Sequence, residues 1–348
     1  MYIHFKKDRL LNSSCIFRSD DAHLLGIDSD PFSAQSHRFA KTWDSINAQT
    51  EDNFRFSLKT IVDQFTHLPK GVHNVVCVVT YLNDHDYFLN AIESILRQTR
   101  KPDSIIIGVD AASNERSSYD LEEALSHLQA AGISAIIRHF SGLNGPYHIL
   151  NTIVCELDDS SYLWLHDSDD VSHPTRLEKQ LKFMDYHKLD MCGSFELRFN
   201  QAGFELFQYP INVSRALLTE PGHCMLWPSS LIRIALWRRL AGCSDYYRFG
   251  ADTEFQLRAC FVARIGNTPS FLYARRKRMN SLTTSLQTGH RSWIRGYINS
   301  IYKAEYYQRQ MIRSSGNIPL LTPRFIKEGS RDSGVRSVEE LTEVIIQS

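Results

Sequence analysis

Aspartates cluster directly after one apolar segment of the chain. The run 162–166 (YLWLH) is followed by Asp167, Ser168, Asp169 and Asp170. Two carboxylates that bracket one residue can be aimed to the same side of a loop. Oxygen ligands at that density suit Mg²⁺ or Mn²⁺, which bind through one or two carboxylates plus substrate phosphates. Asp also supports ordinary turns and helix N-caps, so the motif predicts either a divalent metal site or a solvated turn.

Apolar segments of this kind alternate with helical patterns along the chain. Continuous apolar, β-branched runs predict strands at 75–80, 104–109, 134–139 and 162–166. Helical periodicity predicts helices between them at 86–98, 119–131 and 146–156, and a further helix at 175–186. This alternation indicates βαβ units, and therefore an α/β fold with a mostly parallel sheet flanked by helices.

Another aspartate stands where a predicted strand ends. In open parallel sheets ligands bind beyond the carboxyl ends of the strands, so the residues after each strand are informative. Asp110 follows the strand at 104–109. It is either a turn former or a ligand to a ribose or a base.

Composition excludes several classes of partner and compartment. The chain of 348 residues has 39 Lys+Arg and 39 Asp+Glu, so it lacks the basic excess that holds nucleic acid or a bulk anionic membrane. Its seven cysteines form no C-x-x-C pair and are expected to be reduced core thiols. The N-terminal residues lack the apolar run of a signal peptide, and no window approaches the roughly 18 apolar residues of a membrane span. We therefore expect a cytoplasmic protein.

Several motifs occur in the order found in family 2 glycosyltransferases of GT-A fold. The first strand ends in Thr80-Tyr81, the next helix carries IESILRQT at 92–99, and the second strand ends in Asp110. The segment NGPYHILNTIV at 144–154 resembles the family's glycine-then-Asn helix start.

The aspartate segment completes this resemblance. LWLHDSDDVSHPTRLEKQ at 163–180 resembles the family's D-x-D-D motif and the helix that follows it. The resemblance covers about 75–285 and implies a Rossmann-like, mostly parallel sheet with a mixed acceptor-side half. It also implies a metal-dependent transfer of a sugar from a UDP- or GDP-type donor to an acceptor hydroxyl, with inversion at the anomeric carbon.

The resemblance assigns roles to the residues that match the motifs. Thr80 and Tyr81 would border the nucleotide, and Asp110 would hydrogen-bond its base or ribose. Asp167 and Asp169 would bind Mn²⁺ or Mg²⁺, with Asp169 the more direct ligand.

One helix departs from the family pattern. Where the family often has Ala-Arg-Asn, this chain has Ile149-Leu150-Asn151. Asn151 is kept as a nucleotide-binding residue, whereas the arginine contact is absent or replaced, with His148 as one candidate.

The later half of the chain supplies the expected base. FGADTEFQLRA at 249–259 resembles the family's acidic motif near the acceptor, with Ala251 in place of the first acid. Residues two apart on a helix point about 200° apart, so at most one of Asp252 and Glu254 should face the sugar. We choose Asp252 as the base and keep Glu254 as the alternative. Either acid could instead simply favour the helix N-terminus through the macrodipole.

The only dense basic run lies at 275–278. It is either a solvated face or a source of positive charge for the leaving diphosphate, most plausibly through Arg276 or Arg278. His223 and Trp227 precede the base region and could line an acceptor pocket, although a tryptophan is more often part of the core.

Two rival functions remain open at this level. Asp167 to Val171 also fits the D-x-D-x-V pattern of haloacid dehalogenase-type phosphatases, in which the first Asp attacks phosphorus. Those motifs normally follow the first strand of a domain, unlike here. The absent first acid at Ala251 also suggests a nucleotide-sugar-binding module without catalysis.

The resemblance divides the chain into three parts. We expect residues 1–70, in which only 57–66 has helical periodicity, to pack on the glycosyltransferase domain at 71–290. That domain would have a nucleotide-binding half at 71–173 and an acceptor half at 174–290. The helix predicted at 293–312 within the extension 291–348 mixes aromatic and basic residues. It either docks on the domain or contacts a membrane surface or second subunit. The acceptor would be a glycan or a lipid-linked molecule, as in polysaccharide synthesis.

Overall fold

The computed structural model describes most of the chain. The described residues are 16–18, 36–53, 73–82, 84–110, 115–142, 144–200, 203–278 and 281–327. The helix predicted at 57–66 lies outside them.

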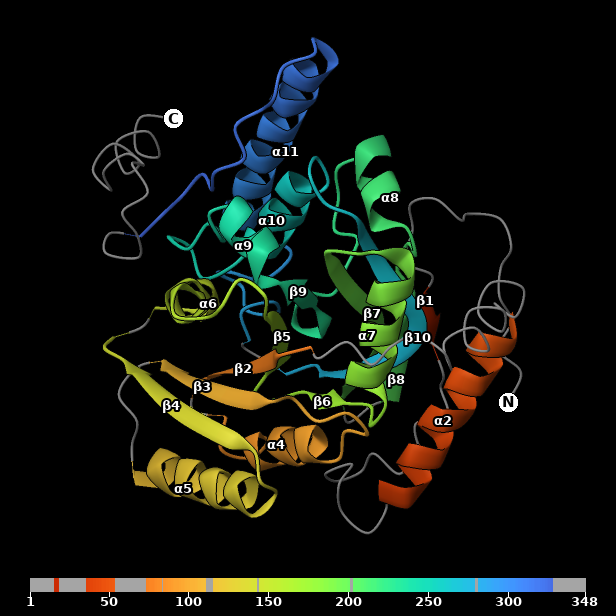
Figure 1. Cartoon of the computed structure of the whole chain (residues 1–348), viewed down its shortest axis with the longest axis vertical. Coiled ribbons are helices and arrows are strands. Elements are labelled where there is room, and N and C mark those ends of the chain that lie inside the picture. The colour runs from red at the N-terminus through yellow and green to blue at the C-terminus, as the bar shows by residue number, and fades with distance from the viewer. Residues whose placement is uncertain are drawn as a thin grey trace.

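The elements alternate between strands and helices up to β5 and are shorter and more mixed afterwards (Figure 1). In chain order they are β1 (Ile16–Arg18), α2 (Ser36–Asn53), β2 (Val75–Tyr81), α4 (Phe88–Leu96), β3 (Ser104–Asp110), α5 (Glu115–Ala130), β4 (Ser134–Phe140), α6 (Pro146–Cys155), β5 (Tyr162–Asp167), β6 (Val171–Ser172), α7 (Arg176–His187), β7 (Met191–Asn200), β8 (Gly203–Phe207), α8 (Val213–Thr219), the 3₁₀ turn η2 (Trp227–Ser229), β9 (Leu231–Arg233), α9 (Ile234–Arg239), α10 (Ala251–Ala259), β10 (Ile265–Arg276) and α11 (Trp293–Ser314).

One sheet runs through the molecule in the order β1-β8-β7-β9-β5-β2-β3-β4, with β10 and β6 joined beside β7. Strands β4, β3, β2 and β5 are parallel, as the alternation of strands and helices predicts. Strand β9 runs antiparallel to both β5 and β7, which makes the second half mixed. The order places β3 and β4 on one side of β2 and β5 on the other, so a topological switch point lies beside β2.

The inner parallel strands β2, β3 and β5 are mostly apolar because both faces of the sheet are covered there, whereas the edge strand β4 is largely exposed. Alternate residues of β2 enter different clusters: Val76 and Val78 pack toward α6, α10 and α11, and Val75, Cys77 and Val79 toward α4, α5 and α7. A strand with period-2 side chains and two buried faces must be hydrophobic at every position. The layers are visible in Figure 1, where α6 and α4 lie on opposite sides of β2.

Gly108 lets α6 approach the sheet closely. A Cβ at this position of β3 would lie 2.4 Å from Ile149 Cγ2 on α6. We expect Gly108→Ala to destabilise the fold by about 1–3 kcal/mol, because overpacking forces the helix away from the sheet. Gly296→Ala on α11, where nothing lies within 4 Å, is the control and should be neutral or stabilising. Urea denaturation of both variants measures the difference, and equal stabilities would contradict the close-packing argument.

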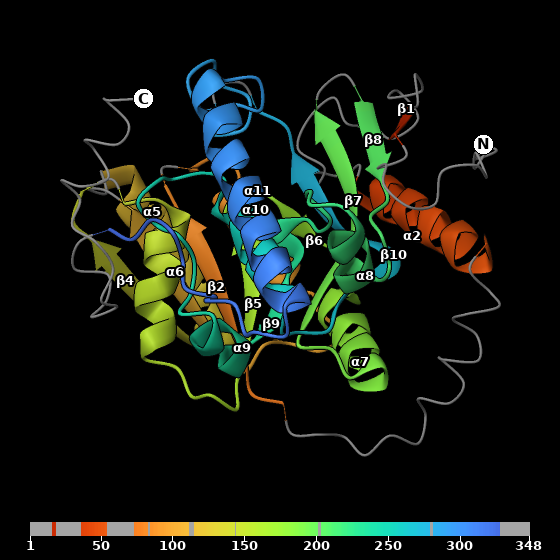
Figure 2. The same cartoon turned by 90° about the horizontal axis from the view of Figure 1, so that it is seen from above.

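Helix α2 packs on the second half of the sheet. Trp43 Nε1 donates to Phe271 O of β10 at 2.6 Å, and Asn47 exchanges hydrogen bonds with the same residue. Figure 2 shows α2 beside β10 and β8. Part of the chain before residue 70 therefore contacts the domain.

Helix α11 docks on the domain. Ile298, Tyr302 and Tyr306 are buried, and Tyr306 Oη donates to Leu217 O at 2.6 Å. Trp293 at its start is 76% exposed. In the described part of the chain, no helix is both long and apolar enough to cross a membrane.

Candidate active site

A cleft of about 610 Å³ opens at the carboxyl ends of β2, β3 and β5, beside the switch point. Ten of the residues singled out in the sequence line it: Thr80, Tyr81, Asp110, Asp167, Asp169, His223, Trp227, Asp252, Arg276 and Arg278. Asn151 and Glu254 are not among the lining residues. The cleft therefore brings together side chains from both halves of the domain.

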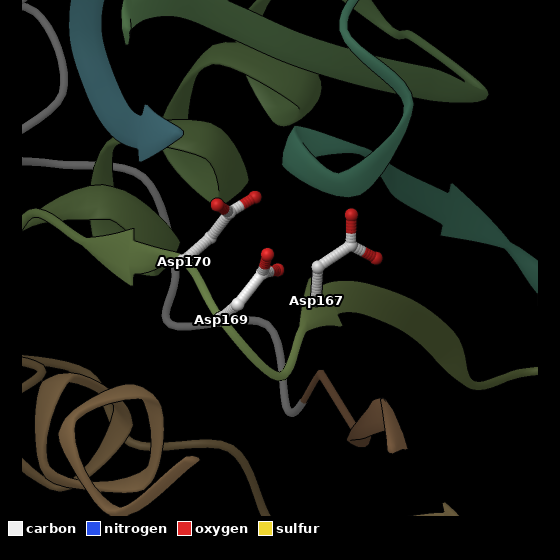
Figure 3. Close-up of side chains that lie close together, drawn as sticks. All are labelled: Asp167, Asp169 and Asp170. Carbon is white, nitrogen blue, oxygen red and sulfur yellow. The ribbon is translucent and has the colours of Figure 1, made fainter. Parts of the chain in front are cut away.

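Three carboxylates meet at the turn between β5 and β6. Asp167, Asp169 and Asp170 each place one ligand oxygen within 4.8 Å of the others (Figure 3). Burial and the neighbouring charge of Asp169 raise the pKa of Asp167 to about 7, and the same causes raise the pKa of Asp170 well above its usual range. Like charges held this closely in a buried turn fit a divalent cation with hard oxygen ligands.

The raised pKa of Asp167 predicts a pH-dependent metal affinity. Mn²⁺ binds the ionised carboxylate of Asp167, so below pH 7 its binding must release the proton of this group. Above pH 7 the carboxylate is already ionised, and the affinity should no longer depend on pH through this group. We expect the dissociation constant for Mn²⁺ at pH 5.5 to be about 30-fold larger than its plateau value at high pH. Calorimetric titration with Mn²⁺ in two buffers of different ionisation enthalpy measures both effects. A flat affinity between pH 5.5 and 8 would contradict the assignment of Asp167.

Arg278 neutralises one edge of this acidic cluster. Its Nε lies 2.6 Å from Asp169 Oδ2, and its Nη2 lies 2.8 Å from Asp84 Oδ1. The second oxygen of Asp84 accepts a hydrogen bond from Ser168 Oγ. Sequence reasoning missed Asp84, although it lies shortly after the end of β2, and Asp110, the last residue of β3, lies at the same edge of the sheet.

Arg276 holds the same edge mainly through its backbone. Its N–H donates to Asp170 Oδ1 at 2.7 Å, and its Nε donates to the carbonyl of Asp169 at 3.1 Å. The guanidinium lies over the ring of Tyr87, 4.1 Å from its centroid. The two arginines proposed for the diphosphate thus lie beside the carboxylates proposed for the metal.

Asp110 caps the start of α6 while it lines the cleft. Its two oxygens accept from the backbone N–H groups of Asn144 and Gly145 at 2.6 and 2.7 Å. Arg248, which sequence reasoning missed, reaches to within 4.0 Å of Asp110 from the loop before α10. An arginine from that loop therefore occupies the part of the cleft where α6 carries none.

The two residues that we expect to border the nucleotide, Thr80 and Tyr81, differ in how far they are exposed. Thr80 lies between Gly108 of β3 and Asp167 of β5 in the strand register. Tyr81 is buried, and its hydroxyl is 3.0 Å from His85 Nδ1. Thr80 is the more accessible of the two, because Tyr81 packs mainly on α4.

Asn151 lies away from the cleft for a structural reason. Its side chain is buried, donates to Cys243 O and Asp245 Oδ2, and accepts from Cys243 N. His148 Nδ1 also lies 3.4 Å from Asp245 Oδ2. Both side chains therefore anchor the loop before α10, and neither reaches the donor side of the cleft.

Asp252 and Glu254 point to different surroundings. Asp252 lines the cleft from the first turn of α10, with its side chain 20% exposed. Both oxygens of Glu254 accept from Arg258, and this pair is fully buried. Arg258 also donates to the carbonyls of Leu240, Gly242 and Leu321. Of the two alternatives for the base, only Asp252 faces the cleft.

The two residues considered for the acceptor lie near Asp252. His223 Nδ1 is 3.2 Å from Thr253 Oγ1 and 3.7 Å from Asp252 Oδ2. Trp227 lines the cleft but is 7% exposed, and its ring packs 5.4 Å from that of Phe255. Trp227 therefore belongs to the core as well as to the wall of the cleft.

The segment after α11 crosses the loop that precedes α10. Asp245 N–H donates to Phe325 O at 2.8 Å, and Lys327 N–H donates to Asp245 Oδ1 at 2.7 Å. Lys327 Nζ reaches Asn144 Oδ1 at 2.6 Å, next to the cap made by Asp110. The segment after α11 thus holds the loop that carries Arg248 in place.

Residues 75–223 match the sequence model of glycosyl transferase family 2. This segment of the chain is therefore of the family 2 glycosyltransferase type. The phosphatase interpretation of Asp167 is not supported, because the aspartate turn lies inside the matched glycosyltransferase segment.

Two curated relatives carry glycosyltransferase names. An uncharacterized glycosyltransferase of Methanocaldococcus jannaschii is 25% identical over 189 residues, which are 53% of this chain and 63% of that protein. The bifunctional glycosyltransferase pgtA of Dictyostelium discoideum is 33% identical over 124 residues, 32% of this chain and 14% of that protein. The matches thus span less than two thirds of either relative.

The fold of the glycosyltransferase domain is of the GT-A type, as its sequence motifs predict. A structure of GalNAc-T7 superposes with a TM-score of 0.51 at 10% identity, covering 80% of this chain and 55% of that one. At this identity the likeness concerns the fold alone.

Proposed function

We propose that the chain transfers a sugar from a nucleoside diphosphate sugar of the UDP or GDP type to an acceptor hydroxyl, with inversion and with the help of a divalent metal. The observation that carries this proposal is the cleft. It is lined by the carboxylates at the end of β5, by arginines beside them and by the accessible acid Asp252. A donor bound at the strand ends and an acceptor bound near α10 would meet between them.

The donor end supplies positions for the nucleotide and the diphosphate. Asp110 and Arg248 would contact the base or ribose, since they face each other at the start of α6. Arg276 and Arg278 would bind the diphosphate oxygens, because guanidinium groups pair well with phosphates. Each of these side chains is already held by a neighbour, which reduces the entropy lost on binding.

Asp167 and Asp169 would hold the metal, with one oxygen of Asp170 available from the same turn. The bound cation would act as a Lewis acid that offsets the charge developing on the leaving diphosphate. The GalNAc-T7 structure was determined with UDP, GalNAc and Mn²⁺, which supports Mn²⁺ as the first metal to test.

Asp252 would accept the proton of the acceptor hydroxyl as it attacks the anomeric carbon. A general base at this point contributes about 10²–10⁴-fold. Attack from the side opposite the nucleotide would invert the configuration. We expect the acceptor to be a glycan or a lipid-linked molecule, as in polysaccharide synthesis.

A ligand screen tests the proposal directly. The melting temperature of the full chain is measured with UDP-, GDP-, dTDP- and CMP-sugars, each with and without Mn²⁺. A ligand present at 100 times its dissociation constant adds about 2.7 kcal/mol to the free energy of unfolding. A donor that binds should therefore raise the melting temperature measurably. We expect one UDP- or GDP-sugar to stabilise the chain only with Mn²⁺, and to be slowly hydrolysed. Stabilisation without hydrolysis or transfer would favour the non-catalytic binding module, and no stabilisation by any donor would contradict the proposal.

A further inference from the structure

Several basic side chains line the cleft together with Asp252. We call His223, His290 and Arg295 the basic end; all three line the cleft. Burial, followed by the charges of Arg295, Arg275 and His223, lowers the pKa of His290 to about 4. These three residues and Arg275 all line the same cleft, although they come from separate parts of the chain.

The charge of Asp252 acts on Arg295, but within the described residues no carboxylate forms a direct ion pair with it. The residue is 7% exposed, and its Nε and Nη2 donate to the carbonyls of Thr288 and Leu282 at 2.7 and 2.8 Å. Its guanidinium also lies over the ring of Phe249. Among the described residues no carboxylate oxygen lies within 4.0 Å of it. A buried guanidinium held only by carbonyls and a ring is costly unless a ligand supplies the counter-charge.

Arg275 adds positive charge at the border of the basic end. It shares Glu196 with Arg198: Arg198 makes two contacts to that carboxylate at 2.8 and 3.0 Å, and Arg275 Nη1 lies 3.7 Å away. The charges of Asp170 and Asp167 also act on Arg275, so its guanidinium lies between the aspartate turn and the basic end. Arg275 Nη2 also donates to Thr283 Oγ1 at 3.2 Å, which directs it toward the segment that carries His290.

We propose that the acceptor carries a phosphate group next to the hydroxyl that is glycosylated, and that His223, His290 and Arg295 bind this phosphate. The inference rests on the proposed function, because it names the acceptor of the same cleft. A phosphate carries a charge of about −1.5 to −2 and several strong acceptor oxygens, which match one guanidinium and two imidazoles better than a single carboxylate does. A neutral acceptor would leave Arg295 without a directly paired counter-charge.

The side chains of the basic end are arranged to receive a ligand. The ring of His290 makes no hydrogen bond within the described residues, and the side chain of His223 is 40% exposed. The ring nitrogens of both imidazoles could donate hydrogen bonds to the phosphate oxygens. Asp252 lies beside them and would reach a hydroxyl near the phosphate.

Calorimetry on the full chain tests the proposal with the donor end already filled by UDP or GDP and Mn²⁺. The probes are glycerol 3-phosphate, the diester glycerophosphoglycerol, glycerate and glycerol. We expect at least tenfold tighter binding of a phosphate probe than of glycerol or glycerate. Binding of the monoester alone would indicate a terminal phosphate, whereas equal binding of the diester would indicate a phosphodiester chain or lipid phosphate; both outcomes support the proposal.

Variants locate the bound phosphate. Arg295→Gln and His290→Gln should each lower the affinity for the phosphate probe about tenfold, because each removes a hydrogen bond to a charged group. His290→Gln is included because Arg295 also holds the loop at 282–288 and its variant could perturb that loop. The control is Arg291→Gln, which removes the same charge from an exposed neighbour that does not line the cleft.

Three results would overturn the inference: no preference for phosphate over glycerol or glycerate, unchanged affinity in both basic-end variants, or phosphate binding that the nucleotide abolishes. The last would place the phosphate in the donor end. If the nucleotide itself does not bind, the proposed function fails first, and the acceptor role fails with it. Nucleotide binding without phosphate preference contradicts this inference alone.

Discussion

The Asp169→Asn protein is expected to lose at least 10²-fold in donor turnover with Mn²⁺ present, while keeping its fold. Asp169 lies in the three-carboxylate turn and is paired on its other side by Arg278. Removing its charge weakens the metal site, and the Lewis acid contribution that is lost is worth several kcal/mol, which corresponds to at least two powers of ten in rate.

Two measurements separate loss of the metal from loss of structure. Calorimetry should show weaker Mn²⁺ binding, and the melting temperature without metal should equal that of the wild type or rise, because one of several repelling charges is gone. The matched control is Asp159→Asn. It makes the same change before the opposite end of β5, where Asp159 is exposed and paired with Arg238. Metal-dependent turnover that matches the wild type in Asp169→Asn would remove this residue from the metal site.

The Asp252→Asn protein is expected to bind the donor normally and to transfer the sugar about 10²–10⁴-fold more slowly, as expected for loss of a general base. The amide has nearly the shape of the carboxylate, so the first turn of α10 should be preserved. Single-turnover transfer, measured beside donor binding, distinguishes this result from a binding defect. Normal turnover would show that Asp252 is not the base.

Glu254→Gln provides the contrast within the same helix. It should leave transfer per folded molecule unchanged but destabilise the protein by about 3–5 kcal/mol, because it leaves Arg258 buried without its partner. In chemical denaturation, Asp252→Asn should therefore be the more stable variant, although Glu254→Gln should be the more active one. Slow transfer by a stable Glu254→Gln protein would move the base to that residue.

The sequence predicted the parallel half of the fold well because its signal there is local. Strands buried on both faces are apolar at every position, as in β2 and β3, and helices between them show one apolar stripe. The aspartate turn was equally visible, since all its carboxylates lie within four residues of each other.

The acceptor side was predicted less completely because it is assembled from distant segments. Arg248, His290 and Arg295 follow no motif, and only the packing of α10 and α11 brings them to the same cleft. Spacing along the helix limited the base to one of two acids, but the burial of Glu254 against Arg258 was needed to choose between them. Asn151 matched a family position, and yet its amide is used to hold Cys243 and Asp245.

The hydrogen bonds made by the segment after α11 bear on which fragment of the chain can act alone. A fragment that ended with the matched region at residue 223 would lack Arg248, Asp252 and Arg258 altogether. A fragment that ended with the domain expected from the motifs at residue 290 would leave Arg258 without its bond to Leu321. It would also leave Asp245 without Phe325 and Lys327. The loop and helix that carry Arg248 and Asp252 would then lose their outer support. The smallest fragment expected to be both folded and active therefore extends at least to Lys327.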